Sequence, residues 1–385
     1  MTSLPLSGLV VVELGTSVAA PFGGLILAEL GADVIKVEKA RGGDDARSWG
    51  PPFVDGTAAV FHAINRNKRS AAIDFTDGTQ CDALRRFIVA RADVVLQNLR
   101  PGTVEKFGLD AAALRAKKPA LIYCNLAAFG SRGPLKDKPG YDPLMQAFGG
   151  IMSITGEDGR PPVRVGPSLV DQGAGMWAVI GILAALQRLN ATGEGCVVGT
   201  SLYETALAWT GMHTANFLAS GKVPRRLGSE NFGIAPYRAY QAQDGWIVIA
   251  AGNDNLFARL CRALARPEWI DDPAFRTNPD RVKNRDRLNA LLTDVIATDT
   301  RDAWRQKLDA AGVPCAPVLG LDEVQAHPQS RAVEMLQDAP DGGLPLMGIP
   351  LAFDGARPPY RNRAPDLGDA TATIIEPASN DRAAE

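Results

Sequence analysis

The chain has 385 residues, of which 46% are hydrophobic and 22% are charged, and its formal net charge is −2. This length is sufficient for two domains with a sizeable core, and scattered basic residues at a near-neutral net charge argue against a nucleic-acid-binding protein. No N-terminal segment has the layout of a signal peptide, and no apolar run reaches the roughly 18 residues that span a membrane. We therefore expect a cytoplasmic protein without membrane partners.

The first 40 residues predict a strand–helix–strand unit. Residues 9–14 form a short apolar run rich in β-branched side chains, which is typical of a buried strand. A loop of small residues follows, and Pro21 fits the first turn of a helix that stops at Gly31. Residues 33–38 form a second apolar run. This order predicts a parallel sheet with crossover helices, and therefore an α/β fold.

The same alternation continues to about residue 190 and then changes. Strands are predicted at residues 70–75, 93–98 and 120–126, and helices at residues 78–91 and 174–189. The last helix is long and strongly apolar, so we expect it in the core or at a subunit interface. Farther on, a hairpin pattern around Asp244-Gly245 and helical patterns at 256–264, 285–297 and 301–311 predict a smaller α+β domain, residues 212–326.

Two common kinds of site are not indicated. The five cysteines are far apart and only three histidines are present, so neither a disulfide framework nor a Cys/His zinc site is predicted, and we expect no metal. The loop from Gly15 to Ala20 lacks the G-x-G-x-x-G spacing with which a dinucleotide pyrophosphate is bound. An NAD-dependent enzyme is therefore disfavoured.

Two polar segments adjoin predicted strands. Residues 65–70 place three cations at a strand entrance, and this segment is either a solvated loop or a patch for a phosphorylated ligand. Residues 98–102 add Arg100 and an amide at a strand end. Because ligands of open α/β sheets bind beyond the carboxyl ends of the strands, these segments favour a site for a large phosphorylated cofactor.

Asp171 directly precedes the long predicted helix. It is either the N-cap of that helix or a functional carboxylate, and the two roles are compatible. A helix N-terminus stabilises an anion, so Asp171 is expected to be ionised and available as a nucleophile at neutral pH. The small residues Gly173, Ala174 and Gly175 are expected to leave room for a substrate.

Short motifs occur in a fixed order along almost the whole chain: residues 6–14, 31–38, 43–44 with Arg47, 49–53, 65–70, 92–94 with Asn98, 100–102, 129–130 with 133–134, 140–142, and 166–175 around Asp171. In this order they resemble the class III coenzyme A transferases, the family of formyl-CoA transferase and carnitine CoA-transferase. The resemblance implies a Rossmann-like large domain built from both chain ends, residues 1–211 and 327–385, with the small domain between them. It also implies an interlocked homodimer.

The resemblance further implies an enzyme that moves CoA between carboxylic acids. The family's nucleophilic aspartate matches Asp171, whose carboxylate would form first a mixed anhydride and then an aspartyl-CoA thioester. Acyl-CoA and the acid are then substrates, and no tightly bound cofactor is expected. The family's CoA contacts, carried over by position, fall on Val18, Ala19, Lys39, Ile73, Asp74, Phe75, Asn98, Leu99, Arg100, Lys106, Lys138 and Tyr141.

Two departures from formyl-CoA transferase bear on the substrate. Val18 replaces a glutamine that serves the small substrate there, and residues 228–233 do not reproduce its glycine-rich loop. Both argue against formate and oxalate. Residues 228–253 look closer to the members that use succinyl-CoA with dicarboxylate acceptors such as glutarate.

Two alternative functions remain. Members of the same fold that racemise α-methylacyl-CoA carry a histidine where this chain has Tyr141, and none of His62, His213 and His327 falls at that position. A tyrosine is too weak an acid to replace imidazole easily. A non-catalytic acyl-CoA-binding protein is the second alternative, and the presence of Asp171 argues against it.

Overall fold

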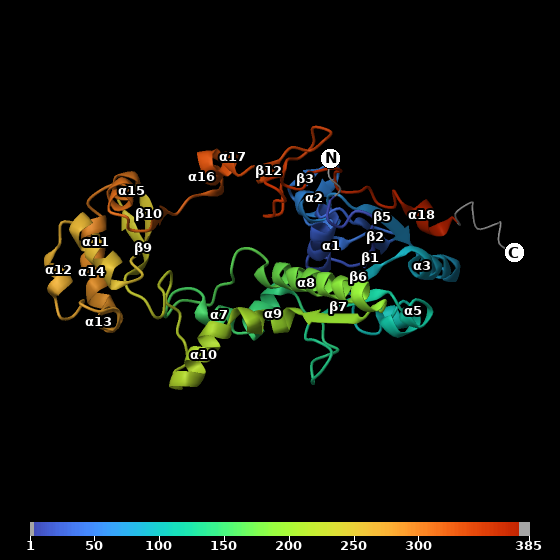
Figure 1. The fold of residues 1–385 in the computed structure, drawn as a ribbon, viewed down its shortest axis with the longest axis horizontal. Coiled ribbons are helices and arrows are strands. Elements are labelled where there is room, and N and C mark those ends of the chain that lie inside the picture. Colours follow the sequence, from blue (N-terminus) through green and yellow to red (C-terminus); the bar gives the residue numbers. More distant parts are fainter. Residues whose placement is uncertain (1–3, 377–385) are drawn as a thin grey trace. The chain divides into compact units, whose positions relative to one another are not determined.

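The computed structural model describes residues 4–376, which form two compact units (Figure 1). The first unit contains the chain up to Ile151, then Arg164–Lys222, and then the segment from Arg331 onward. The second unit contains Met152–Val163 and Val223–Ser330.

A six-stranded sheet forms the centre of the first unit, and every neighbouring pair of strands in it is parallel. The strand order is β5-β2-β1-β6-β7-β8. The bounds are β1 (Val10–Leu14), β2 (Asp33–Lys39), β5 (Arg69–Ile73), β6 (Val94–Gln97), β7 (Ile122–Ala127) and β8 (Val197–Ser201). The direction of strand progression reverses between β1 and β6, as in doubly wound folds. The predicted α/β fold is confirmed, although β8 was not predicted.

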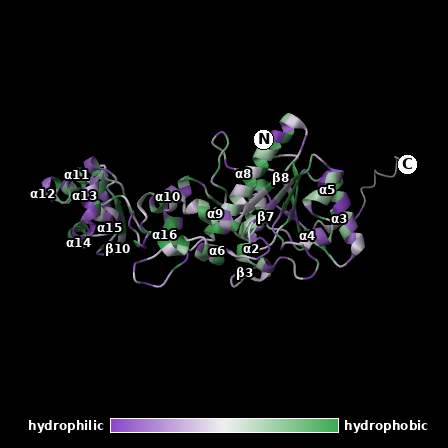
Figure 2. Cartoon of the chain, turned by 90° about the horizontal axis from the view of Figure 1, so that it is seen from below, coloured by the Kyte–Doolittle hydropathy of each residue, from purple (hydrophilic) through white to green (hydrophobic). Residues whose placement is uncertain are grey.

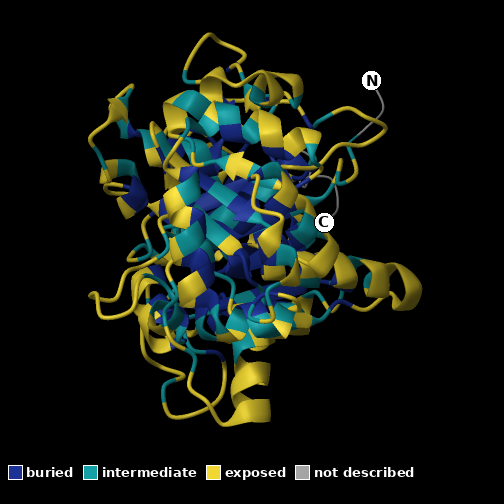
Figure 3. Ribbon diagram, turned by 90° about the vertical axis from the view of Figure 1, so that its left-hand side faces the viewer, coloured by how far each residue is buried: buried dark blue, intermediate teal, exposed yellow. Residues whose placement is uncertain are grey.

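Helices cover both faces of this sheet. The helices of this unit are α1 (Ala19–Glu29), α2 (Ala59–Asn65), α3 (Gly78–Arg91), α4 (Thr103–Lys106), α5 (Ala111–Lys117), α6 (Asp142–Phe148), α8 (Leu169–Thr192), α9 (Leu202–Trp209) and α10 (Gly211–Ser220). The unit also has a 3-10 turn η1 (Asp45–Ser48) and a hairpin of β3 (Phe53–Val54) and β4 (Thr57–Ala58), and α7 (Ile151–Ile154) lies at the boundary to the second unit. Successive strand residues face opposite sides, so Val11 packs in the layer of α1 and α8 while Val12 packs in that of α3 and α5. Hydrophobic residues concentrate on the strands and on the helices that cover them (Figure 2). Buried residues gather in the interior, and the exposed ones lie mainly on loops and outer helix faces (Figure 3).

Helices α1 and α8 approach each other closely because both carry glycine at the contact. A Cβ atom on Gly175 would lie 2.6 Å from the carbonyl oxygen of Ala19 and 3.0 Å from the amide nitrogen of Gly23. Gly173 is buried in the same way against Trp209 of α9. The prediction that these small residues leave room for a substrate is therefore wrong, since they allow helices to pack. By length and composition α8 could also span a membrane, but half of its apolar window is buried in the protein.

The second unit is built on an antiparallel sheet of three strands, β9 (Tyr237–Ala242), β10 (Gly245–Ala250) and β11 (Cys315–Pro317). Its helices are α11 (Asp254–Ala263), α12 (Glu268–Asp271), α13 (Asn278–Lys283), α14 (Arg285–Ile296), α15 (Arg301–Ala310) and α16 (Leu321–Ala326). The short helix α17 (Pro328–Ala332) crosses the boundary at which the chain returns to the first unit. Tyr240, Ile247, Leu288 and Trp304 are among the side chains of its own buried core.

The unit boundaries differ from those drawn on the sequence. Helix α10 belongs to the first unit, so the second unit resumes at Val223 and not at residue 212. Residues 152–163 belong to the second unit, because they bond to the segment that follows α10. The amide of Gly228 donates to the carbonyl oxygen of Gly156 at 2.8 Å, and Arg225 lies 3.7 Å from Asp158.

The segment from Arg331 onward contains β12 (Leu336–Gln337), β13 (Leu346–Met347) and α18 (Thr371–Ile375). Arg66 and Asn67 attach it to the N-terminal part of the chain. The Arg66 guanidinium donates to both oxygens of Glu29 at 2.9 Å and to the carbonyl oxygen of Leu346 at 3.2 Å. The Asn67 side-chain oxygen accepts two backbone N–H groups, those of Arg361 and Asn362, each at 2.8 Å.

These contacts correct the interpretation of residues 65–70 as a phosphate patch. Arg66 and Lys68 are fully buried in ion pairs with Glu29 and Glu13. Arg69 remains partly exposed but pairs with Asp33. The cations of this segment therefore join parts of the first unit and are occupied by carboxylates.

Arg66→Met should be strongly destabilising, because it leaves the Glu29 carboxylate buried without its cation. We expect a loss of about 3–5 kcal/mol in the free energy of unfolding, measured by urea titration. Arg66→Met combined with Glu29→Gln should recover most of this loss, and Arg69→Met should cost less than about 1 kcal/mol since its ion pair is exposed. Equal losses for Arg66→Met and Arg69→Met would contradict the structural role assigned to Arg66.

Candidate functional site

A cavity of about 580 Å³ opens beyond the carboxyl ends of the central strands. Its walls are the loops that follow β1, β6 and β7, together with the start of α8 and of α9 (residues 16–19, 97–101, 103–105, 125–128, 130–131 and 136–141, with Asp45, Asp171 and Leu202). The cavity thus lies at the point where the strand order reverses, which is where open α/β sheets bind ligands. Its volume is within the range of about 300–1,000 Å³ that is usual for small-molecule sites.

Asp171 lies in the wall of this cavity. It is the third residue of α8, because the helix begins at Leu169 with Ser168 as its N-cap residue. The prediction that Asp171 itself is the N-cap is therefore wrong. Its side chain is only 8% exposed, and within residues 4–376 its carboxylate receives no hydrogen bond or ion pair. The site therefore presents a nearly dry carboxylate to the cavity.

Asp142, the first residue of α6, takes the backbone donors at the start of α8. Its Oδ1 atom accepts the N–H of Val170 at 2.8 Å and the N–H of Asp171 at 3.3 Å. Its Oδ2 atom accepts the side-chain amide of Gln146 at 2.6 Å, and the Gln146 carbonyl in turn accepts the N–H of Val165 at 2.8 Å. Asp142 and Gln146 are both buried. The helix-end donors that would stabilise the Asp171 anion are thus already occupied.

This arrangement determines how Asp171 ionises. Burial and, second, the neighbouring charge of Asp142 raise the pKa of the Asp171 carboxyl to about 7. The expectation that the helix N-terminus holds Asp171 fully ionised at neutral pH is therefore wrong, because that N-terminus serves Asp142. A poorly solvated carboxylate that is half ionised near pH 7 can attack an electrophilic carbonyl without first losing a hydration shell.

The structure brings together about half of the side chains predicted to contact CoA. Val18, Ala19, Asn98, Leu99, Arg100, Lys138 and Tyr141 line the cavity with Asp171. Arg100 and Lys138 are exposed cations there, and Lys136 adds a third that the sequence analysis did not single out. Such a cluster suits phosphate or carboxylate groups of a ligand.

The other predicted contacts do not line the cavity: Lys39, Ile73, Asp74, Phe75 and Lys106. The Lys39 ammonium lies 2.7 Å from Asp45, which does line it. Ile73 is fully buried in the core, while the Phe75 ring lies 5.1 Å from the Phe107 ring. Lys39 ends β2, residues 73–75 lie at and just after the end of β5, and Lys106 lies in α4 after β6. Their contact with a nucleotide stays a prediction.

Two features of the site were missed or misjudged on the sequence. Asp142 and Gln146 were not identified, although their spacing of four residues places both on one helix face. Asn98 was assigned to ligand contact, but its side chain bonds both the N–H and the carbonyl of Thr16, at 2.9 and 3.0 Å. It therefore fixes the loop after β1 as well as lining the cavity.

The histidines lie elsewhere in the described chain. None of His62, His213 and His327 lines the cavity with Asp171 among residues 4–376. The ring nitrogen of His62 lies 3.1 Å from the carbonyl oxygen of Val54. Proton exchange between a histidine and Asp171 is thus not supported by this geometry.

Comparisons with known proteins agree with this geometry. Residues 6–371 match the sequence profile described as CoA-transferase family III. The chain is 37% identical to a succinate–glutarate CoA-transferase of Agrobacterium fabrum over 96% of this chain and 95% of that protein. It is also 37% identical to an acetyl-CoA:oxalate CoA-transferase of Acetobacter aceti, over 96% and 95%. A crystal structure of a CAIB/BAIF family protein from Brucella suis has 41% identity and a TM-score of 0.86, covering 97% of this chain and 99% of that one.

Asp171→Asn should stabilise the protein at alkaline pH. The pKa of Asp171 is raised from its ordinary value of 3.8 to about 7, so the folded state binds this proton more tightly than the unfolded chain. The wild-type protein therefore loses stability as pH rises from about 4 to about 7, by on the order of 4 kcal/mol, whereas asparagine does not titrate. Urea unfolding between pH 5 and pH 8 should show a stability difference that grows with pH.

Asp137→Asn is the matched control, since Asp137 lines the same cavity but is exposed. It should show no such growth. A difference between Asp171→Asn and the wild type that stays constant with pH would contradict the raised pKa.

Proposed function

The chain belongs to CoA-transferase family III, and on this premise we propose that it moves CoA from succinyl-CoA, or a similar dicarboxylyl-CoA, to a dicarboxylic acid, with Asp171 as the covalent carrier. The observation that carries the proposal is the buried carboxylate of Asp171, unpaired among residues 4–376, in the wall of the cavity. A pure binding protein has no need of such a group beside a thioester.

The first half of the reaction forms the enzyme-bound thioester. An Asp171 oxygen attacks the carbonyl carbon of the acyl-CoA, the C–S bond breaks, and CoA leaves as a thiolate. The thiolate then attacks the Asp171 carbonyl carbon of the mixed anhydride. The C–O bond to that carbon breaks, so the donor acid leaves as a carboxylate and CoA remains on Asp171.

The second half repeats these steps in reverse. The acceptor carboxylate attacks the aspartyl thioester, CoA leaves and then attacks the acceptor carbonyl of the new anhydride, and Asp171 is restored as a carboxylate. No proton is gained or lost overall. Because only the ionised form of Asp171 attacks, transfer should decline as pH falls below about 7.

Three observations support a dicarboxylate. The cations Arg100, Lys136 and Lys138 at the cavity exceed what a single small carboxylate needs, since CoA phosphates and a distal carboxylate both require positive partners. Val18, which stands where formyl-CoA transferase has a glutamine, presents an apolar wall suited to a longer acid. The relative named for succinate and glutarate acts on two dicarboxylic acids of that longer kind. We assign the nucleotide end of CoA to Lys39, Ile73, Asp74, Phe75 and Lys106.

The proposed chemistry uses side chains alone, so no tightly bound cofactor or metal is proposed. The five cysteines are free thiols, and two of them are only partly buried. Free thiols of this kind persist in a reducing compartment, and we propose the cytoplasm as the place of action. Cell fractionation tests this assignment, and recovery of the protein outside the cytoplasmic fraction would contradict it.

We also propose an interlocked homodimer. The consecutive helices α8, α9 and α10 expose several large apolar side chains in the single chain, which we call the α8–α10 apolar surface: Met176, Trp177, Ile180, Leu183, Leu207, Trp209, Met212, Phe217 and Leu218. Helix α10 has no buried residue at all. A soluble chain rarely leaves so many large apolar side chains in water, and a second copy would cover them.

The mass in solution, measured by light scattering, should be twice that of one chain. Ile180→Asp should shift this mass toward the monomer, because it places a charge on the α8–α10 apolar surface. The exposed apolar residue Leu321 lies on α16, outside that surface, so Leu321→Asp should leave the mass unchanged. A wild-type monomer at micromolar concentration would contradict the dimer.

Incubation with succinyl-CoA should attach CoA to the protein. Intact-mass spectrometry should show the adduct on the wild type and its loss after an acceptor dicarboxylate is added. Asp171→Ala should form no adduct and should lose transfer by a factor on the order of 10⁴ or more. Asp110→Asn removes a carboxylate at another helix start, the N-cap of α5, and should form the adduct normally.

Two outcomes would overturn the proposal. One is an adduct that persists on Asp171→Ala. The other is exchange of the α-proton of a branched acyl-CoA with solvent deuterium in the absence of transfer, which would indicate a racemase.

A further inference from the structure

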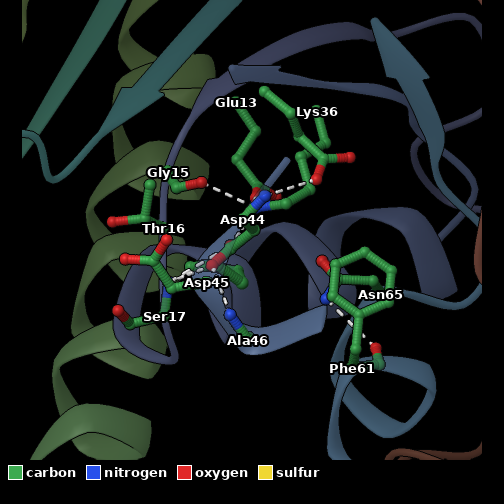
Figure 4. Close-up of polar contacts among 12 residues, drawn as sticks. Glu13, Gly15, Thr16, Ser17, Lys36, Asp44, Asp45, Ala46, Phe61 and Asn65 are labelled. Atoms are coloured by element: carbon green, nitrogen blue, oxygen red, sulfur yellow. Dashed lines mark hydrogen bonds and ion pairs between the residues drawn. The ribbon is translucent and has the colours of Figure 1, made fainter. Parts of the chain in front are cut away.

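Four ionisable side chains, those of Glu13, Lys36, Asp44 and Lys68, are buried together beneath the loop that follows β1. Figure 4 shows the first three of them. Lys36 lies 3.0 Å from Glu13 and 2.8 Å from Asp44, and Lys68 lies 2.8 Å from the second oxygen of Glu13. All four side chains are 0% to 3% exposed. Two carboxylates and two ammonium groups balance in charge, so the cluster is neutral as a whole.

The cluster holds the backbone of the loop at two points and the first turn of α1 at a third. The Lys36 ammonium donates to the carbonyl oxygen of Gly15 at 2.6 Å, and the N–H of Ser17 donates to the Asp44 carboxylate at 3.1 and 3.2 Å (Figure 4). The Lys68 ammonium donates to the carbonyl oxygen of Pro21 at 2.7 Å. Ser17 is held in a left-handed conformation, with φ of 66°, between these contacts. The buried charges thus hold the loop from below, while the Asn98 side chain holds it at Thr16.

The loop held in this way forms one side of the reaction cavity. Val18 and Ala19 follow Ser17 directly and line the cavity that Asp171 also lines. The carbonyl of Ala19 further lies against Gly175, one helical turn after Asp171. A shift of the loop therefore changes the distance between this wall and the nucleophile.

Stability alone does not account for the cluster. Buried ion pairs lose on desolvation about as much as they gain by attraction, and apolar side chains of similar volume often serve equally well. Lys36 nevertheless remains charged, since Glu13 and Asp44 outweigh the effect of burial and raise its pKa to about 12. Charged side chains can also form hydrogen bonds with individual backbone atoms and so hold them in place. Apolar side chains cannot do this.

We propose that Lys36 and Asp44 are positioning residues that set the wall at Val18 and Ala19 against Asp171 for the acyl-transfer step. This inference rests on the transferase function proposed above. Val18 and Ala19 are two of the predicted CoA contacts, whereas the cations Arg100, Lys136 and Lys138 are on other loops, so most of the attraction for CoA does not depend on the cluster. Disturbing it should therefore affect the rate of chemistry more than the binding of acyl-CoA.

The double variant Lys36→Met/Asp44→Asn separates positioning from stability. It removes one positive and one negative charge and leaves Glu13 paired with Lys68, so no unpaired charge stays buried. The Gly15 carbonyl loses its donor. Both enzymes are assayed at a temperature well below the melting point of the variant. We expect kcat to fall about 10-fold to 100-fold, while KM for succinyl-CoA changes less than about threefold.

Arg66→Met/Glu29→Gln is the matched control. This pair is equally buried, at 0% exposure of both side chains, but its hydrogen bonds go to the C-terminal segment and not to residues 15–21. Per folded molecule, this variant should keep the wild-type kcat. A Lys36→Met/Asp44→Asn enzyme with the control's kcat would overturn the inference, and so would a large rise in KM at unchanged kcat.

If the double variant does not fold, Asp44→Asn alone can be used for the same test. In this single variant Lys36 keeps its ion pair with Glu13, so no buried charge is left without a partner. It too should lose kcat, and full activity would overturn the inference. The wild-type enzyme is assayed first. A wild type that does not transfer CoA contradicts the proposed function, whereas a wild type that transfers CoA and a variant that equals it contradict only the role of Lys36 and Asp44.

Discussion

The site depends on the competition of two carboxylates for one helix start. The backbone N–H groups in the first turn of α8 can stabilise a single anion, and Asp142 takes them. Asp171 is thereby left buried, next to a like charge and without hydrogen-bond donors of its own within residues 4–376. A carboxylate in this state is costly for the fold and reactive toward a carbonyl, which is the usual relation between stability and function at an active site.

The rest of the first unit supplies what this carboxylate needs. The reversal of strand order between β1 and β6 opens the cavity, and the loops after β1, β6 and β7 give it walls. Glycine contacts bring α1 against α8 beside Asp171. Buried ion pairs help to fix the loop after β1, and the Arg66–Glu29 pair joins the C-terminal segment to the end of α1. Buried ion pairs and close helix packing therefore hold the walls of the cavity in place. The nucleophile itself lowers the stability of the fold.

The sequence predicted the sheet well, because β-branched runs and their turn residues are local signals. Strand β8 was not predicted because its sequence gives little apolar signal. Its residues alternate between exposed and half-buried, and Gly199 lies in the middle. Residues 65–70 were misjudged because a row of cations looks the same whether it faces a phosphate or a buried carboxylate distant in sequence, as Arg66 and Glu29 show. Asp142 was missed for a related reason, since its partners lie 28 and 29 residues away.

The central claim is that Asp171 itself carries the acyl group and then CoA, and oxygen exchange tests it most directly. In the proposed sequence, an acceptor acid labelled with ¹⁸O in its carboxylate leaves one labelled oxygen on Asp171 when CoA departs with the new acyl group. After a single turnover, the peptide that contains Asp171 should be heavier by one ¹⁸O in place of ¹⁶O. Label found only in the acyl-CoA product and in water, with none on this peptide, would contradict the account.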